Sequence, residues 1–415
     1  MSDPAKVRVR GPLASLFPGF RIRLAALGYS PGTAAQQHQM LADLSGWMHA
    51  RGLAILDLSP EAVEEFFRHR RQSHRNLITA RSLDRFIEFL SDSDIKRAAA
   101  APSVLPGWEQ VLVRFEQYLS RERALAPTTV ESYLNQVRPF LRWRAGRTNS
   151  DLGSLSVSEV TGFLLVRGSK ESAGSVRVAV TALRALLKWL YLSGTIDEAL
   201  AEGIGPVSYS AFGALPKALP PAQVSDLISH AADSRLSPRR DRAIIVLLSR
   251  LGLRSREAAG LLIDDLNWRA GTVLVHGKGG FTEPMPLPAD AGAAIAGYLE
   301  HERPATPDRH LFLQAKAPHA PLGRSAISAV VSRMGQRAGM ASPVGAHRLR
   351  HSAATGVLAA GGTLTEAAQL MRHTSPASTV IYARVDLTAL RTLARPWPGA
   401  ERGTPGSVTV PGRVR

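Results

Sequence analysis

The residues best suited to chemistry lie in four short segments of the C-terminal half, and their reactive side chains are mainly arginine, lysine, histidine and tyrosine. The segments are 252–257 with Arg254 and Glu257, 277–280 with Lys278, 347–351 with His347, Arg350 and His351, and 370–382 with His373 and Tyr382. Guanidinium groups bind phosphate through paired hydrogen bonds and stay charged at physiological pH. A tyrosine hydroxyl becomes a covalent nucleophile when a neighbouring group accepts its proton.

Each segment also has an ordinary structural interpretation. Segment 252–257 would suit a junction between two helices, 347–351 the solvated start of a basic helix, and 277–280 a simple hairpin turn. A single tyrosine is most often a half-buried packing residue. No segment identifies a function alone, so the interpretation depends on their order.

That order resembles the tyrosine recombinase and phage integrase family, which includes Xer-like and transposon-type site-specific recombinases. The first arginine box of that family is similar to Leu251-Gly252-Leu253-Arg254-x-x-Glu257, and the second to His347-x-Leu349-Arg350-His351. Lys278 stands in a Gly-Lys-Gly turn between the boxes, where the family places its catalytic lysine. Tyr382 follows Leu370-Met371-Arg372-His373 by nine positions (382 − 373), like the family's closing His and nucleophilic Tyr. The resemblance covers roughly residues 216–393.

The resemblance implies an enzyme that cleaves and rejoins duplex DNA through a 3′-phosphotyrosyl bond, with Tyr382 as the nucleophile. Arg254 and Arg350 would bind the two non-bridging oxygens, where negative charge develops. His347 would accept or orient the tyrosine proton, and Lys278 would protonate the departing 5′ oxygen.

Three further residues take supporting places in the same resemblance. His373 would donate a hydrogen bond to a non-bridging oxygen, Glu257 would hold the first arginine box, and His351 the second. Because two arginines supply positive charge, we expect neither a metal nor another cofactor. The histidines do not form His-Glu-x-x-His, and the chain has no cysteine that could bind zinc.

The chain departs from the family pattern in three places. The hairpin continues as Gly280-Phe281-Thr282-Glu283 where further basic residues are usual, which weakens one expected phosphate contact. Arg372 stands where the family usually has glycine, and it is a candidate for an added DNA contact. Two helical repeats precede the catalytic region, where the family rarely needs two.

The elements that must position these residues are mostly amphipathic helices. In the C-terminal half the pattern predicts a helix over 221–251, a strand over 272–276, a return strand over 283–287 and helices from 325 to 393. The basic, Pro/Gly-rich tail over 396–415 predicts disorder. The expected fold is mostly α with a small antiparallel β-sheet, built from helical core-binding domains and a catalytic domain.

The N-terminal half carries an internal repeat. Three sets of residues match: Pro31, Thr33 and Trp47 with Pro127, Thr129 and Trp143 at an offset of 96 (127 − 31); Leu58-Ser59 with Leu155-Ser156 at 97 (155 − 58); and Leu83 and Leu90 with Leu183 and Leu190 at 100 (183 − 83). Helical bundles share such spacing by chance as well, but matched Pro and Thr at helix starts favour duplication. The expected domains are 1–100, 107–202 and 221–395, with a linker at 203–220.

The composition indicates a polyanionic partner. Lys and Arg number 51 against 34 Asp and Glu, a formal net charge of +17, which favours nucleic acid or an anionic membrane surface. No run approaches the roughly 18 apolar residues that span a bilayer, and the first residues have no apolar signal core. Together with the absence of cysteine, this predicts a cytoplasmic protein.

The resemblance implies double-stranded DNA as the partner, enclosed by the catalytic domain and the bundle before it, and a homo-oligomer that forms a tetrameric synapse, with partner recombinases if it needs them. Candidate phosphate contacts are Arg138, Arg142, Arg144, Arg147 and Lys188, although each is equally compatible with a solvated face. The first repeat is interpreted either as a DNA-contacting module or as one that joins protomers. Its basic cluster is Arg68, His69, Arg70, Arg71, His74 and Arg75.

Two other functions stay open from the sequence. A type IB topoisomerase uses similar chemistry as a monomer, and a non-catalytic DNA-binding subunit would keep the fold without the reaction. The complete set of reactive residues argues against a decayed site. The sequence does not indicate the DNA target, or whether the outcome is integration, excision, inversion or transposition.

Overall fold

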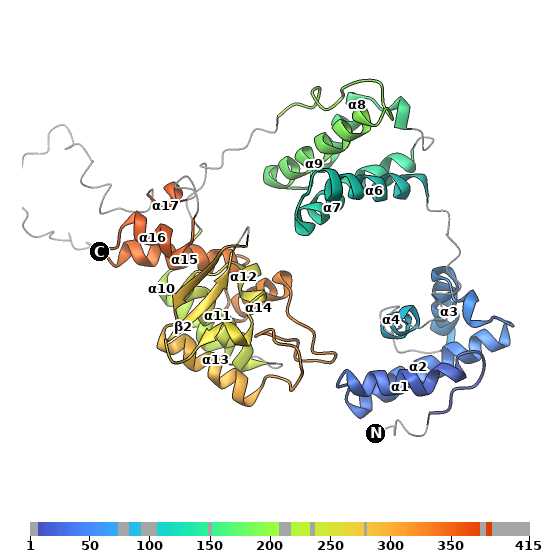
Figure 1. The fold of residues 1–415 in the computed structure, drawn as a ribbon, viewed down its shortest axis with the longest axis horizontal. Coiled ribbons are helices and arrows are strands. Elements are labelled where there is room, and N and C mark those ends of the chain that lie inside the picture. Colours follow the sequence, from blue (N-terminus) through green and yellow to red (C-terminus); the bar gives the residue numbers. More distant parts are fainter. Residues whose placement is uncertain are drawn as a thin grey trace, which may run out of the picture. The chain divides into compact units, whose positions relative to one another are not determined.

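The computed structural model describes residues 7–73, 83–92, 106–147, 152–206, 217–232, 237–277, 280–373 and 379–383. The chain forms two compact units, one of Ala98–Gly213 and one of Met1–Arg97 with Ala214–Arg415. Within them we describe a first bundle (7–92), a second bundle (106–206) and a C-terminal domain (217–383), each by itself (Figure 1). None of the helices in the described ranges is long and apolar enough to cross a membrane.

The first bundle is helical, with a core rich in aromatic side chains. Its elements are η2 (Ala14–Leu16), α1 (Phe17–Ala26), α2 (Pro31–Ala50), η3 (Ile55–Asp57), α3 (Pro60–Ser73) and α4 (Asp84–Asp92). Helix α2 begins where it does because the Ser30 hydroxyl accepts the Thr33 N–H at 3.4 Å and Pro31 takes the first turn. Phe20, Trp47, Phe66 and Phe86 pack in the core.

The second bundle has the same order of helices. Its elements are α6 (Gly107–Gln117), which continues into the π-turn η5 (Tyr118–Glu122), then α7 (Pro127–Ala145), η6 (Leu152–Ser154), α8 (Val157–Gly168) and α9 (Ala173–Leu192). A capping box starts α8, because Ser156 accepts the Glu159 N–H at 3.4 Å and the Glu159 carboxylate accepts the Ser156 N–H at 3.2 Å. The core extends past α9 to Ile204.

Equivalent side chains of the two bundles make equivalent contacts. The ring centroids of Trp47 and Phe66 lie 5.8 Å apart, and those of Trp143 and Phe163 lie 5.5 Å apart. Three more contacts of the first bundle have a counterpart in the second. The contact of Arg51 with Trp47 corresponds to that of Arg147 with Trp143, the contact of Phe20 with Phe89 to that of Phe115 with Trp189, and the contact of Arg70 with Met40 to that of Arg167 with Gln136. These repeated contacts agree with the duplication that the matched sequence positions favour.

The C-terminal domain is built around α11 (Pro238–Leu251). All residues from Ala243 to Leu248 are buried, because other helices surround α11. The helices in contact with α11 are α10 (Pro221–Ala231), α12 (Ser255–Ala259), α13 (Ala289–His301), α14 (Arg324–Arg337) and α15 (Ala346–Ala359). Helix α16 (Leu364–Leu370) packs on α15, and α17 (Val380–Ala383) is the last described helix. The core of this domain begins at Leu219, and the core of the second bundle ends at Ile204. Both residues lie inside the predicted linker, 203–220.

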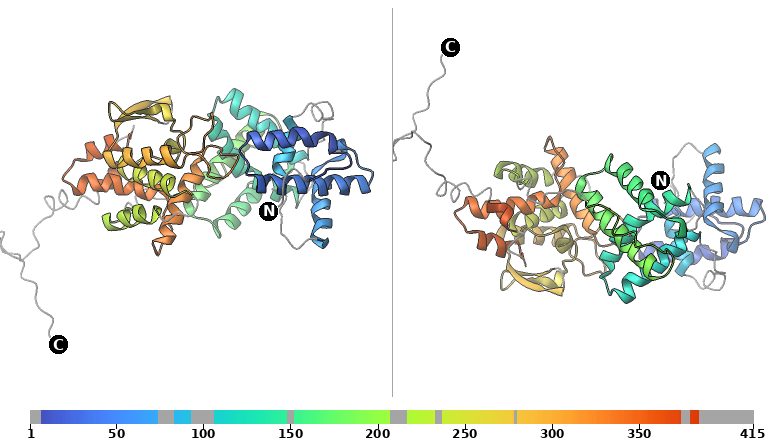
Figure 2. Two further views of the ribbon diagram at one scale, coloured as in Figure 1. Left: turned by 90° about the horizontal axis from the view of Figure 1, so that it is seen from below. Right: turned by 90° about the horizontal axis from the view of Figure 1, so that it is seen from above.

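A three-stranded antiparallel sheet lies at one edge of these helices (Figure 2). The strands are β1 (Leu266–Asn267), β2 (Thr272–His276) and β3 (Thr282–Pro286), and Val273 of β2 pairs with Leu266 and with Met285. The prediction for 272–276 is confirmed, and the return strand lies one residue earlier than predicted. Strand β1 was not predicted, since two residues give no periodic pattern. The tip of the hairpin at 278–279 lies outside the described residues.

Candidate active site

The first arginine box is shaped by a left-handed turn after α11. Gly252 has φ +56°, a conformation that L side chains rarely adopt, and a Cβ there would lie 3.1 Å from Met371 Sδ. The backbone conformation therefore favours glycine, and a Cβ would also require Met371 to shift by a few tenths of an ångström. The turn places Arg254 at the start of α12 with its side chain 43% exposed.

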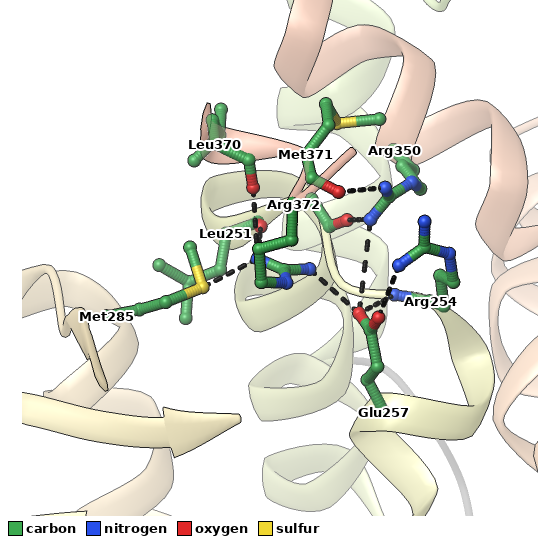
Figure 3. Close-up of polar contacts among 9 residues, drawn as sticks. Leu251, Arg254, Glu257, Met285, Arg350, Leu370, Met371 and Arg372 are labelled. Atoms are coloured by element: carbon green, nitrogen blue, oxygen red, sulfur yellow. Dashed lines mark hydrogen bonds and ion pairs between the residues drawn. The ribbon is translucent and has the colours of Figure 1, made fainter. Parts of the chain in front are cut away.

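Glu257, on α12, holds Arg254 in this position. Its carboxylate is 4% exposed and accepts the Arg254 backbone N–H at 2.8 Å, the Arg254 guanidinium at 2.6 Å and Arg372 at 2.8 Å (Figure 3). Burial acts to raise the pKa of Glu257, but the hydrogen bond from Arg254 and the charge of Arg372 outweigh burial and lower that pKa. An ionised Glu257 fits the supporting place predicted for it.

Arg350, on α15, joins the segments that carry the other site residues. Its side chain is 2% exposed, and it donates to the Gly252 carbonyl at 2.5 Å and to the Met371 carbonyl (Figure 3). Burial and the charge of Arg254 lower the pKa of Arg350 to about 10, so it remains a cation at neutral pH. Arg350 is thus fixed between the turn before Arg254 and the turn before His373.

A hollow of about 400 Å³ lies where the two boxes meet. Guanidinium, imidazole and hydroxyl groups line it, namely Arg254, Ser255, Arg256, Arg324, Ser325, Ser328, His347 and Arg350. None of the described residues that line it is a carboxylate, so the hollow suits an anion. Arg256 and Arg324 were not among the predicted residues. Arg324 is the first residue of α14, and the periodic pattern that predicts a helix does not identify its first residue as functional.

Tyr382, on α17, is 1% exposed, and its hydroxyl meets His351 rather than His347. The hydroxyl and His351 Nδ1 are 2.6 Å apart. Burial raises the pKa of Tyr382, against the charges of Arg350 and Arg254, so the phenol is protonated at neutral pH. His351 was predicted to support the second arginine box, and its contact with the Tyr382 hydroxyl was not predicted.

The other two histidines lie next to this pair. His347 meets His351 edge to face with ring centroids 4.3 Å apart, and the Nδ1 of His373 is 2.8 Å from Thr379 Oγ1. Burial lowers the pKa of His351 to about 4, helped by the charge of His347. Burial and the charge of Arg350 likewise lower the pKa of His373 to about 4, and the pKa of His347 is lowered by the same causes. The imidazoles are thus neutral at neutral pH.

Lys278 lies outside the described residues, so its predicted place in the site stays a prediction. Within the described ranges, no three His, Asp or Glu side chains come together as a metal site requires.

The basic residues predicted on the second bundle differ in exposure. Arg138, Arg142, Arg147 and Lys188 are exposed, with the Arg142 guanidinium 5.3 Å from the Trp108 ring centroid. Arg144 is a correction: its side chain is 3% exposed, donates to Ser154 at 3.1 Å and pairs with Glu159 at 3.8 Å. Its place in the turn of α7 directs it into the bundle, where it joins α7 to α8 and is not available to phosphate.

The first bundle repeats only one residue of this basic face, Arg51 at the position of Arg147, and Arg51 pairs with Glu65 at 3.4 Å. At the offsets of the repeat, Ala42, Gly46 and Glu88 stand where the second bundle has Arg138, Arg142 and Lys188. Its predicted basic cluster is divided. Arg68, His69 and Arg71 are exposed, Arg70 pairs with Asp43 at 2.9 Å, and His74 and Arg75 lie outside the described residues.

Comparisons with known proteins cover most of the chain. The family model "Phage integrase family" matches residues 217–388, and "Phage integrase, N-terminal SAM-like domain" matches residues 112–194. Putative integrase/recombinase y4rA of Sinorhizobium fredii is 35% identical over 94% of this chain and 95% of its own length. Tyrosine recombinase XerD of Mycobacterium tuberculosis is 32% identical over 68% of this chain and 94% of its own length.

Solved structures show the same fold. A lambda integrase dimer bound to a COC′ core site gives a TM-score of 0.54 at 16% identity, over 84% of this chain and 91% of that one. XerH recombinase in a post-cleavage complex gives 0.52 at 21% identity, over 80% and 93%. From the identities to y4rA and XerD, the chain belongs to the phage integrase family of tyrosine recombinases, which break and rejoin DNA at specific sites through a phosphotyrosyl bond.

Proposed function

We propose that Tyr382 forms the covalent bond to DNA in this chain, at a phosphate bound by Arg254 and Arg350. The observation that carries the proposal is the 2.6 Å contact between the Tyr382 hydroxyl and His351. That contact lies on α15, the helix that also carries Arg350. A buried phenol with a neutral acceptor at hydrogen-bond distance, next to two fixed guanidiniums, suits nucleophilic attack on a phosphodiester.

The reaction follows from these groups. The Tyr382 oxygen attacks phosphorus while its proton moves to His351, and the bond from phosphorus to the 5′ oxygen breaks. We assign Lys278 as the donor that protonates this leaving oxygen. The products are a 3′-phosphotyrosyl bond and a free 5′-hydroxyl. Attack by a 5′-hydroxyl on the phosphotyrosine reverses the steps, so rejoining needs no ATP.

The histidines divide the remaining tasks. His351 takes the tyrosine proton, because it is neutral and in contact with the hydroxyl. His347 lines the hollow beside both arginines, a place that suits contact with a non-bridging oxygen. His373, next to the same arginines, is assigned the hydrogen bond to phosphate that the family resemblance implies.

The DNA is double-stranded in this proposal, and the active form is a homo-oligomer on two duplexes in the cytoplasm. Supporting structures include a lambda integrase tetramer bound to a Holliday junction, with a TM-score of 0.54 at 18% identity. The exposed Arg138, Arg142, Arg147 and Lys188 are the proposed phosphate contacts of the second bundle, and the hollow serves the cleaved phosphate. The name of y4rA, putative integrase/recombinase, favours integration as the outcome.

The proposed domains are 1–100, 107–202 and 221–395, with the packed cores of the last two reaching into segment 203–220, to Ile204 and from Leu219. Of the basic face of its copy, the first bundle keeps only Arg51, which pairs with Glu65. We therefore favour a role in joining protomers over a phosphate contact through the α2 face.

Replacing Tyr382 with phenylalanine should abolish covalent capture of DNA and leave duplex affinity unchanged, because only the phenol oxygen is lost. Nicked suicide duplexes that tile the DNA flanking the gene would trap the wild-type chain as a denaturant-resistant band. Equal trapping of Tyr382→Phe would show that another residue is the nucleophile.

Replacing His351 with alanine should slow covalent capture at neutral pH by about 100-fold or more, the usual contribution of a general base. Without an acceptor the phenol must ionise unaided, so the rate should climb from pH 7 to 9 while the wild-type rate stays flat. His347→Ala is the matched control, expected to be slow but flat with pH. A flat profile for His351→Ala would remove His351 as the acceptor.

Covalent capture should persist in excess EDTA, since arginines supply the positive charge that a metal would otherwise provide. The measurement is the yield of the denaturant-resistant band with EDTA, with magnesium and with neither. Loss in EDTA and recovery with magnesium would contradict the expectation.

Arg142→Ala and Arg144→Ala should separate affinity from stability. Removal of the exposed Arg142 should reduce the slope of log affinity against log salt by about 0.9, without lowering the unfolding temperature. Removal of the buried Arg144 should destabilise the second bundle by about 3 kcal/mol and leave the salt slope unchanged. Fluorescence anisotropy measures DNA affinity at each salt concentration, and calorimetry measures the unfolding temperature. A loss of stability in Arg142→Ala, or a reduced salt slope in Arg144→Ala, would contradict the assignment.

A further inference from the structure

Arg372 occupies an unfavourable backbone conformation. It follows α16 with φ +51°, in the left-handed region that favours glycine. Only two other described non-glycine residues, Ala124 and His319, share positive φ. An arginine in this conformation requires an interaction of its side chain that compensates for the backbone.

The side chain of Arg372 points into the domain and is 7% exposed. Its guanidinium donates to the Leu370 carbonyl at 2.9 Å and to the Glu257 carboxylate at 2.8 Å, and lies 2.6 Å from Met285 Sδ (Figure 3). The Leu251 carbonyl is 3.4 Å away. Arg372 thus joins the end of α16 to the end of α11, to α12 and to β3. This inward direction does not support the added DNA contact that the sequence suggested.

The contact with Glu257 connects Arg372 to the exposed guanidinium of the site. The Arg372 guanidinium and the Arg254 backbone N–H share Glu257 Oε2, and the Arg254 guanidinium takes Oε1. Arg372 therefore fixes the plane of the carboxylate that orients Arg254. His373 is the next residue in the chain, so the same contact sets the distance between the first arginine box and the segment with His373.

We propose that Arg372 is a positioning residue for the strand-cleavage reaction: it holds Glu257, and through Glu257 it directs Arg254 toward the phosphate. The inference rests on the proposed place of Arg254 at the cleaved phosphate. It predicts that loss of Arg372 lowers the rate of the chemical step and leaves DNA affinity unchanged.

The test compares Arg372→Gly, which suits the left-handed backbone, with Arg372→Lys, which keeps the charge, and with Arg309→Ala, which breaks the exposed ion pair to Asp264. At saturating suicide duplex, Arg372→Gly should slow covalent capture roughly 10- to 100-fold, and Arg372→Lys should recover part of the rate. Affinity and its salt dependence should match wild type. Arg309→Ala should react like wild type.

A double-mutant cycle with Glu257→Gln separates positioning from general stability. If Arg372 acts through Glu257, Arg372→Gly should add little to the loss that Glu257→Gln already causes. Fully additive losses, an unchanged rate in Arg372→Gly, or a shallower salt dependence would each overturn the proposal.

Hydrogen exchange without DNA distinguishes this proposal from the proposed function. The Arg254 N–H is bonded to Glu257, so its exchange should accelerate in Arg372→Gly and not in Arg309→Ala. Unchanged exchange would overturn the positioning role even if Tyr382 proves to be the nucleophile. Faster exchange would support it even if covalent capture fails for every duplex, an outcome that would count against the proposed function alone.

Discussion

One buried carboxylate, that of Glu257, holds the positive part of the candidate site together. Arg254, Arg372 and Arg350 approach it at 2.6, 2.8 and 3.9 Å. Like charges so close would repel strongly in a poorly solvated interior, so a partly buried group of this kind needs a counter-charge. Since one carboxylate balances three guanidiniums, positive charge remains for an anion, and the exposed Arg254 presents it.

The same positive charge serves the proton chemistry. Arginines near the histidines disfavour imidazolium, and together with burial they keep His347, His351 and His373 neutral. A neutral imidazole accepts a proton, whereas a charged one does not. The groups proposed to bind phosphate therefore also leave His351 unprotonated beside the Tyr382 hydroxyl, while the same charge lowers the affinity of His351 for a proton. Both effects depend on the burial of α15 against the end of α11.

The two helical bundles show how differently interior and surface are constrained. The interior contacts of Trp47 and Trp143 are repeated, because close packing tolerates few changes of shape. The outer positions differ: Arg138 corresponds to Ala42 and Lys188 to Glu88, and exchanges of exposed side chains cost little stability. The two bundles therefore share their interior packing but not their pattern of surface charge.

The sequence by itself determined the family, the helical class, the helix starts at Pro31 and Pro127, and the strand at 272–276, because motifs, caps and alternation are local signals. Tertiary structure alone decided which side chains face inward. His347 and His351 share a face of α15, and only the packing of α17 brings Tyr382 to His351. In the sequence, Arg144 and Arg372 do not differ in residue type from arginines that are exposed. They are buried in the structure, where each pairs with a carboxylate from another segment of the chain. Those contacts depend on how helices pack, which neither residue type nor spacing specifies.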